Sequence, residues 1–321
     1  MTTVIPETSR TALIDEILEL KAERGAAILA HNYQIPDIQD LADVVADSLK
    51  LARQATEVDA ERIVLCGVYF MAETAVIANP DKQVLIPDPK AGCSLAETIQ
   101  ARDVRRWREK HPDGMVVAYV NTSAEVKAEV DYCCTSGNAV AVIDAIPRDV
   151  PLMFLPDFFL GNYLREVTGR EMDIWLGECH VHAGLSPDVV ETKRKEMPDA
   201  ELLVHPECGC VTSILYYLNH EGKIDNHTRI VSTEQMMLRA RVSEAKRFVV
   251  ATETGVLHRL RKENPDKEFF AAAESAECRY MKMITLEKLR DSLRYLRYEV
   301  TVPPDIAVRA RRAIDRMLAI G

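Results

Sequence analysis

The chain has 321 residues, of which 47% are hydrophobic and 28% are charged, and this is enough apolar content for two domains or three small ones. Asp and Glu outnumber Lys and Arg by 50 to 40, giving a net charge of −10, and this acidic balance argues against a nucleic-acid-binding protein. No stretch reaches the ~20 apolar residues of a membrane span, and residues 1–25 lack the basic and apolar regions of a signal peptide. We therefore expect a cytoplasmic protein with no membrane partner.

Three segments of the chain repeat the same order of elements. Each begins with an apolar, strand-like run that ends in polar residues: AILAHNYQ at 27–34, VVAYVNTS at 116–123 and LLVHPECG at 202–209. In each segment a short helical stretch, a β-branched or aromatic step, a second helix and two further strands follow, and the segment then reaches a cysteine. Alternating apolar strands and helices are typical of parallel sheets that are covered on both faces.

The repeat predicts an α/β protein of three consecutive homologous units, each with a short parallel sheet. The predicted ranges are 1–113, 114–199 and 200–321. Apolar residues at helical spacing between 11 and 23 and between 304 and 320 predict flanking N- and C-terminal helices, which belong to the first and third ranges. One or two irregular α/β domains are the alternative.

Polar residues stand in pairs at the ends of the three strand-like runs. The pairs are His31 and Tyr33, Tyr119 and Asn121, and His205 and Glu207. Residues two apart on a strand point to the same side, and ligands of open parallel sheets gather at the carboxyl ends of the strands. Glu207 is therefore a candidate general base, or a partner that orients His205; a solvated carboxylate is the alternative.

Each repeat also delivers one cysteine, and these are Cys93, Cys179 and Cys278. If the three units pack around a shared axis, the three thiolates converge on one site. Such a trio without a nearby fourth ligand could hold Zn²⁺ or an iron–sulfur cluster with one open iron. The residues alone leave both alternatives open.

The other five cysteines have different surroundings. Cys66 lies inside an apolar strand, and the adjacent Cys133 and Cys134 are poorly placed to close a disulfide, so we expect all three to pack. Cys208 and Cys210 lie beside Glu207, and a ligand or redox role for them stays open.

Small hydroxyl residues open the second helix of each repeat, among them Ser48, Ser136 and Thr233. They have a plain interpretation as helix N-caps. A helix N-terminus also attracts anions, and Gly137 would let the backbone approach a carboxylate or phosphate closely. We expect an anionic substrate, with His31, His182 and His205 assisting its binding.

Taken together, these motifs resemble the quinolinate synthase family, the A protein of bacterial NAD biosynthesis. The resemblance covers nearly the whole chain through AHNYQ, GVYFMAETA, PDPKAGCSLA, AYVNTSAEVKA, CTSGNA, GECHVHAG, HPEC, ATETGVLHRL and CRYMKMITLEKL. It implies three α/β domains around a pseudo-threefold axis and one [4Fe-4S] cluster per chain. Three cysteines, one from each domain, would bind the cluster and leave one iron open to substrate.

The resemblance implies a condensation of iminosuccinate (iminoaspartate) with dihydroxyacetone phosphate to give quinolinate, phosphate and water. It assigns Cys93, Cys179 and Cys278 as cluster ligands and the open iron as a Lewis acid. Glu207 and Tyr33, with His205 in support, are our choices for proton transfers. The implied substrate contacts are His31, Ser48, Tyr119, Val120, Asn121, Ser136, His182, His205, Pro206, Glu207 and Thr233.

The chain departs from the family pattern at two points. The third cysteine motif reads CRYMK where CPNMK is expected, which affects the local turn more than the ligand. Some members carry clustered cysteines near the C-terminus, whereas no cysteine follows Cys278 here. No redox switch of that kind is therefore expected.

Two other functions compete with this assignment. A zinc-dependent hydrolase or deaminase would use His205-Pro206-Glu207 as its H-x-E signature, but the downstream P-C-x-x-C pair of that signature is missing. An iron–sulfur sensor or electron carrier would not need the polar strand ends around the cluster. Whether the protein is a monomer or a homodimer, and whether it makes transient contact with L-aspartate oxidase, stays open at this point.

Overall fold

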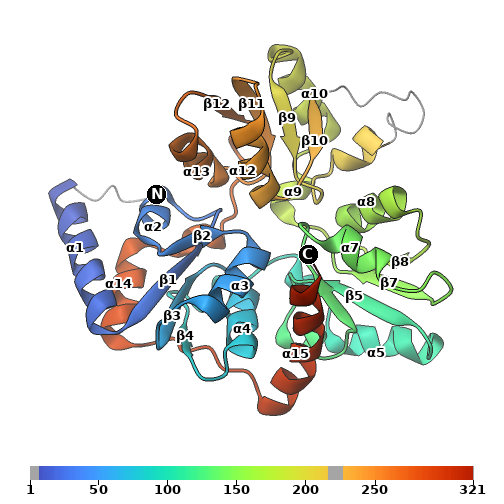
Figure 1. Cartoon of the computed structure of the whole chain (residues 1–321), viewed down its shortest axis with the longest axis horizontal. Coiled ribbons are helices and arrows are strands. Elements are labelled where there is room, and N and C mark those ends of the chain that lie inside the picture. Colours follow the sequence, from blue (N-terminus) through green and yellow to red (C-terminus); the bar gives the residue numbers. More distant parts are fainter. Residues whose placement is uncertain (1–6, 216–226, 321) are drawn as a thin grey trace. The chain divides into compact units, whose positions relative to one another are not determined.

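The computed structural model of the chain describes residues 7–215 and 227–320. Within these residues the strands form three four-stranded sheets in which all neighbouring strands are parallel. Figure 1 shows the strands of each sheet accompanied by helices. The α/β fold predicted from the three repeats is therefore confirmed, with one sheet in each repeat.

The three sheets share one strand order. The orders are β2-β1-β3-β4, β6-β5-β7-β8 and β10-β9-β11-β12. In each case the first strand of the repeat is central and the fourth lies at an edge. Because helices cover both faces of such sheets, the central strands carry continuous apolar runs rather than alternating residues, and β9 is buried along its whole length.

The elements of the first repeat are α1 (Glu7–Glu23), β1 (Ala26–His31), α2 (Pro36–Leu41), β2 (Val44–Ala46), α3 (Ser48–Glu57), β3 (Arg62–Cys66), α4 (Tyr69–Ala78) and β4 (Gln83–Leu85). The first predicted range also contains η1 (Ala96–Thr98) and α5 (Ala101–Lys110). The elements of the second repeat are β5 (Met115–Tyr119), α6 (Ala124–Lys127), β6 (Tyr132–Cys134), α7 (Ala139–Asp144), β7 (Leu152–Leu155), α8 (Phe158–Thr168) and β8 (Asp173–Ile174).

The elements that follow are α9 (His180–Ala183), α10 (Pro187–Glu196), β9 (Glu201–Val204), β10 (Thr228–Ile230), α12 (Thr233–Val242), β11 (Arg247–Ala251), α13 (Val256–Glu263), β12 (Glu268–Ala271), η2 (Met281–Met283), α14 (Leu286–Tyr295) and α15 (Pro304–Ala319). The predicted flanking helices correspond to α1 and α15. None of the helices described here combines the length and the apolar character needed to cross a membrane.

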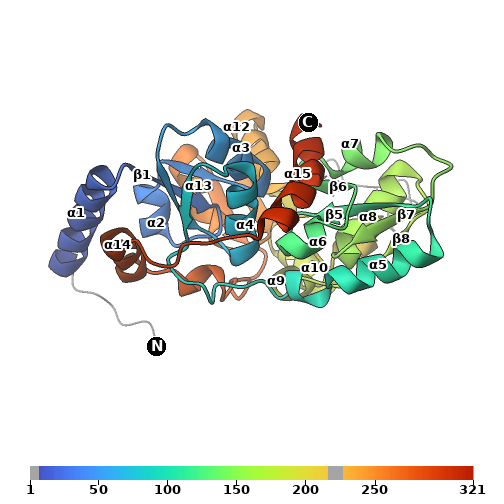
Figure 2. The ribbon, with the colours of Figure 1, turned by 90° about the horizontal axis from the view of Figure 1, so that it is seen from below.

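The chain packs as two compact units. Unit 1 comprises Met1–Gly92 and Arg279–Val302, and unit 2 comprises Cys93–Cys278 and Pro303–Gly321. Unit 1 holds the first sheet, and its helices α1 and α14 lie side by side (Figures 1 and 2). Unit 2 holds the second and third sheets. The three predicted ranges each contain one sheet, while their boundaries after residues 113 and 199 stay predictions.

The C-terminal helix α15 packs against α6 and β6 of the second repeat, within unit 2. Its end is fixed by Asn138, whose Nδ2 donates to the carbonyls of Met317 at 3.0 Å and Ile320 at 2.7 Å. Farther along the helix, Arg309 forms an ion pair of 3.0 Å with Glu129. The helix therefore supports the loop that precedes α7.

Candidate functional site

The three repeat cysteines follow the fourth strands of the sheets on equivalent loops. In each repeat one backbone hydrogen bond holds the loop that carries the cysteine. The donor is an N–H at or just before the start of the helix that follows the third strand, and the acceptor is the carbonyl two residues before the cysteine. These bonds join Tyr69 N to Ala91 O at 2.7 Å, Phe158 N to Gly177 O at 2.7 Å, and Thr254 N to Ala276 O at 2.9 Å. The same local structure therefore orients the loops that carry Cys93, Cys179 and Cys278.

All three cysteines belong to unit 2, form no disulfide and are half-buried. Burial raises the pKa of Cys93 to about 12; backbone N–H groups that donate to its sulfur oppose this rise, and the negative charges of Cys278 and Glu207 add to it. Burial also raises the pKa of Cys179, against the influence of His182 and with a contribution from Cys93. Because these anions oppose one another's ionisation, a cation among them would stabilise the thiolates.

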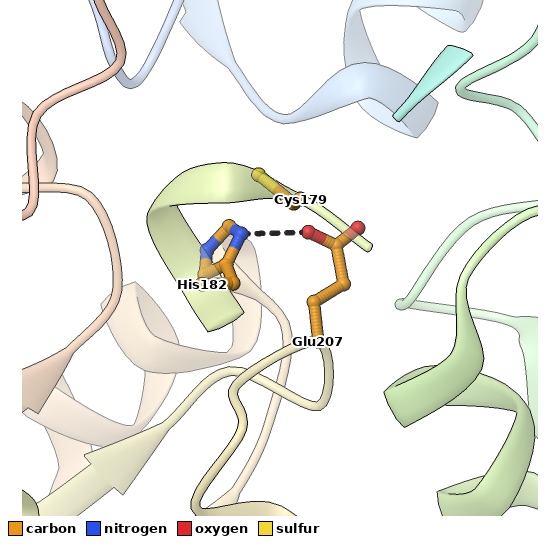
Figure 3. Close-up of side chains that lie close together, drawn as sticks. All are labelled: Cys179, His182 and Glu207. Atoms are coloured by element: carbon orange, nitrogen blue, oxygen red, sulfur yellow. Dashed lines mark ion pairs between the residues drawn. The ribbon is translucent and has the colours of Figure 1, made fainter. Parts of the chain in front are cut away.

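Cys179, His182 and Glu207 form a compact group (Figure 3). One donor atom of each lies within 4.8 Å of the other two, and His182 Nδ1 is 2.8 Å from Glu207 Oε2. Cys179 and His182 lie at α9, whereas Glu207 lies in the loop after β9. The carboxylate oxygen Oε1 of Glu207 is buried without a hydrogen-bond partner.

The electrostatics of this group favour an ion pair. Burial alone would raise the pKa of Glu207, but the charges and hydrogen bonds of His182, His205 and Tyr119 outweigh it and lower the pKa to about 2. Burial alone would lower the pKa of His182, but Cys179 and Glu207 raise it to about 10. At neutral pH the pair is therefore an imidazolium and a carboxylate, although each side chain is only 3% exposed.

Further contacts connect the group to both sheets of unit 2. His182 Nε2 is 2.9 Å from Thr252 Oγ1 at the end of β11, and the ring of His205 stacks on that of His182 with centroids 4.8 Å apart. From the second repeat, Ser136 Oγ lies 3.1 Å from His205 Nε2. The loops that follow the first strands and the hydroxyl residues thus meet, as the strand-end argument predicts.

The remaining predicted residues of unit 2 follow β5, β9 and β10. Val120 is buried in the core, directly after β5. The side-chain oxygen of Asn121 is buried without a hydrogen-bond partner, and Pro206 joins His205 to Glu207. Thr233 is the first residue of α12, and Ser232 caps this helix by accepting from the backbone N–H of Gln235.

The predicted residues of unit 1 lie at the ends of β1 and β2. His31 ends β1, and its ring packs edge-on against that of Tyr33 with centroids 4.5 Å apart. Lys282 Nζ donates to the carbonyl of Tyr33 at 2.6 Å. Ser48 is the first residue of α3, and Asp47 is its cap, accepting from Lys50 N at 3.0 Å. Neither Ser48 nor Thr233 is therefore the N-cap of its helix, because the preceding residue has that role.

Sequence reasoning missed two buried polar residues in unit 2. Thr252, which contacts His182, directly follows β11. Asp157 follows β7 by two residues, is fully buried, and caps α8 by accepting from Leu160 N at 2.7 Å. Burial, with the nearby charge of Glu207, raises the pKa of Asp157 well above its usual range. Both residues follow a third strand, so the strand-end argument applied to third as well as first strands would have found them.

The other cysteines pack in the protein interior. Cys66, Cys133 and Cys134 are fully buried on β3 and β6, which confirms the prediction made for them. Cys208 and Cys210 belong to the hydrophobic core around β9 and β11. Cys208 donates to the carbonyl of Ala251 at 3.0 Å rather than facing the site.

Parallel sheets with titratable side chains gathered at their strand ends define this chain as an α/β enzyme. Residues 15–319 match the family model described as quinolinate synthetase A protein, and the chain belongs to this family. A quinolinate synthase from Thermus thermophilus is 54% identical over 97% of this chain and 98% of its own length. One from Pyrobaculum aerophilum is 54% identical over 95% of this chain and 98% of its own length. Recognition of the family from the sequence motifs is thus confirmed.

Among solved structures, an E-1-hydroxy-2-methyl-but-2-enyl-4-diphosphate reductase from Plasmodium falciparum aligns with 89% of this chain and 94% of its own. The TM-score is 0.35 and the sequence identity is 8%. This likeness is too distant to carry an argument about fold or function.

Proposed function

We propose that this quinolinate synthase condenses iminosuccinate with dihydroxyacetone phosphate to give quinolinate, with loss of phosphate and water. The observation that carries the proposal is the group of cysteines, none of them in a disulfide, beside a buried imidazolium–carboxylate pair in unit 2. Soft metal ligands and a proton acceptor therefore lie together, and the condensation requires both a Lewis acid and proton transfers. Membership of the family over residues 15–319 supports this reaction.

The donor set fits one [4Fe-4S] cluster per chain, held by Cys93, Cys179 and Cys278. All three lie outside disulfides on equivalent loops, and thiolates are the usual ligands of such clusters. The backbone N–H groups of Leu95 and Ala96 donate to the sulfur of Cys93, and bonds of this kind tune cluster potentials. With three protein ligands, the bound cluster would supply an open iron that acts as a Lewis acid for hydroxyl loss.

In this proposal Glu207 accepts a proton from the substrate at Oε1, its buried oxygen without a hydrogen-bond partner. His182, at 2.8 Å from Oε2, keeps the carboxylate ionised. A carboxylate with a pKa of about 2 is a weak base. The two carboxylates of bound iminosuccinate would raise that pKa toward the working range, because like charges disfavour ionisation. Proton transfer would therefore depend on the substrate being bound.

Polar groups around Glu207 suit an anionic substrate. The hydroxyl of Ser136 and the ring of His205 lie 3.1 Å apart, and both can donate to a carboxylate or phosphate. The buried oxygen of Asn121 needs a donor, which the imine or a hydroxyl of a substrate can supply. Contacts of the substrate with His31, Tyr33 and Ser48 of unit 1 stay predictions.

The zinc-dependent hydrolase or deaminase is less well supported. It would need Cys208 and Cys210 as ligands near His205, and both belong to a hydrophobic core.

The imine substrate is unstable, so an enzyme that oxidises aspartate has to supply it. A transient contact with L-aspartate oxidase and a location in the cytoplasm stay predictions.

The proposal is tested by counting iron and acid-labile sulfide in protein purified without oxygen, with quinolinate formation assayed on the same sample. We expect about four of each per chain, as a [4Fe-4S] cluster requires, together with product. A Cys66→Ala variant is the matched control, because this thiol is buried within β3 of unit 1, and it should keep its iron. Zinc in place of iron, even after anaerobic reconstitution, would overturn the cluster mechanism.

A further inference from the structure

Cys179, His182 and Glu207 offer three different metal donors in one place (Figure 3). A sulfur, an imidazole nitrogen and a carboxylate oxygen lie within 4.8 Å of one another. Around a tetrahedral Zn²⁺, bond lengths of about 2.0–2.3 Å place the donor atoms about 3.5 Å apart. The side chains therefore need to move by only about 1 Å to bind one ion. Cys179 is half-buried, whereas His182 and Glu207 are buried.

The surroundings of His182 also suit a metal ligand. Its Nδ1 faces Glu207 at 2.8 Å and its Nε2 faces Thr252 Oγ1 at 2.9 Å. If Nδ1 binds the metal, the proton on Nε2 can be donated to the threonine hydroxyl. A metal-binding histidine nearly always donates its other N–H in this way, and the bond fixes the ring orientation. The structure thus holds the ring in a metal-binding orientation.

We propose that the cluster-free protein binds a single Zn²⁺ through Cys179, His182 and Glu207, with water in the fourth position. Binding displaces the thiol proton of Cys179 and the Nδ1 proton of His182. The ion then takes the place of the proton between His182 Nδ1 and Glu207 Oε2. The site uses one of the three repeat cysteines. If Cys179 is also a cluster ligand, as the proposed function requires, zinc at this site blocks cluster assembly.

The test is a titration of cluster-free protein with zinc chloride in competition with a chromophoric chelator. We expect one Zn²⁺ per chain, and we expect Cys179→Ser and His182→Gln each to weaken binding by about tenfold or more. Cys93→Ser is the matched control, since it removes a neighbouring thiol outside the donor group and should not weaken zinc binding. Equal weakening in Cys93→Ser with none in His182→Gln would identify a thiol-only site and overturn the proposal, as would the absence of binding.

A second measurement on the unaltered chain guards against variants that fail to fold. Co²⁺ substituted for Zn²⁺ should give sulfur-to-cobalt charge-transfer bands with the intensity of one thiolate; the intensity of three would refute the proposed donor set. In a further experiment, protein preloaded with Zn²⁺ should take up less iron during reconstitution, and His182→Gln should relieve this block. If the unaltered chain takes up no iron at all, the cluster is disproved while the zinc stoichiometry still tests this site.

Discussion

Replacing Glu207 with glutamine removes the negative charge of the proposed base and keeps the shape of the side chain. The carboxylate is buried and 2.8 Å from His182, so water cannot readily replace it. General acid–base catalysis by a positioned side chain contributes about 10²–10⁴-fold to a rate. We therefore expect kcat for quinolinate formation to fall by about 10²–10⁴-fold in Glu207→Gln, with the iron content unchanged.

The same change affects stability through His182. Removing one partner of a buried ion pair costs about 3–5 kcal/mol when the other charge stays behind. Loss of the carboxylate removes one of the two groups that hold the pKa of His182 up against burial, so the imidazolium releases its proton more easily and the cost falls. We therefore expect the free energy of unfolding to fall by about 3 kcal/mol or less. The variant should fold, so that its lost activity can be interpreted.

The assay compares kcat, iron content and urea unfolding in Glu207→Gln and in the control Glu274→Gln, which neutralises an exposed acid. The control should match the unaltered enzyme in all three measurements. A kcat in Glu207→Gln that falls by less than about tenfold, or about 1.4 kcal/mol, would refute the role of Glu207 as the base. Loss of iron together with activity would instead mean that Glu207 supports the metal site.

Three further predictions address other parts of unit 2. Cys93→Ser should prevent stable cluster assembly, and iron near four per chain in that variant would remove Cys93 from the ligand set. In His182→Gln the pKa of Glu207 should rise, since the imidazolium no longer acts against burial. The acid limb of the pH profile of kcat should therefore move to higher pH, and an unmoved limb would show that His182 does not set the pKa of the base. Glu201→Gln should lower stability by about 1.5–3 kcal/mol, because Glu201 is buried and accepts from Arg239 and Ser243. Burial alone would raise the pKa of Glu201, but these two partners outweigh burial and lower it below the ordinary value of 4.5. The carboxylate is therefore ionised at pH 7, where urea unfolding should show the full difference in stability between the variant and the unaltered chain. That difference should shrink as the pH falls below 4.5.

The repeated strand pattern predicted the sheets because burial on both faces leaves an unmistakable apolar run. The run that ends at His205 becomes β9, which is buried along its length and central in its sheet. The strand ends then indicated where the polar residues lie, because the carboxyl ends of all strands in a parallel sheet are at the same end of that sheet. Ser136 and His205, 69 positions apart in sequence, are in contact for this reason.

Packing partners were harder to predict. The apolar stripe of α15 indicates that one face is buried, but the stripe does not identify the surface that covers it. The helix belongs by sequence to the third range and packs against α6 and β6 of the second repeat. In the same way, Glu207 was considered as a partner of His205, two residues away, yet the structure pairs it more closely with His182, at 2.8 Å against 3.8 Å. The conformation of the loops determines which histidine pairs with Glu207, and the periodicity of the sequence does not predict loop conformation.

The pairing changes how the site has to be understood, because His182 lies between two acids. Its pKa is raised first by Cys179 and then by Glu207, so its single positive charge is shared between a thiol and a carboxylate. When Cys179 loses its proton on binding a metal, the negative charge of the thiolate has to be balanced by His182 or by the metal. Removing His182 should therefore weaken both zinc binding in the cluster-free protein and proton transfer in the enzyme, and should leave the three thiols intact. A comparison of zinc affinity and kcat between His182→Gln and the unaltered chain tests these two functions of the histidine.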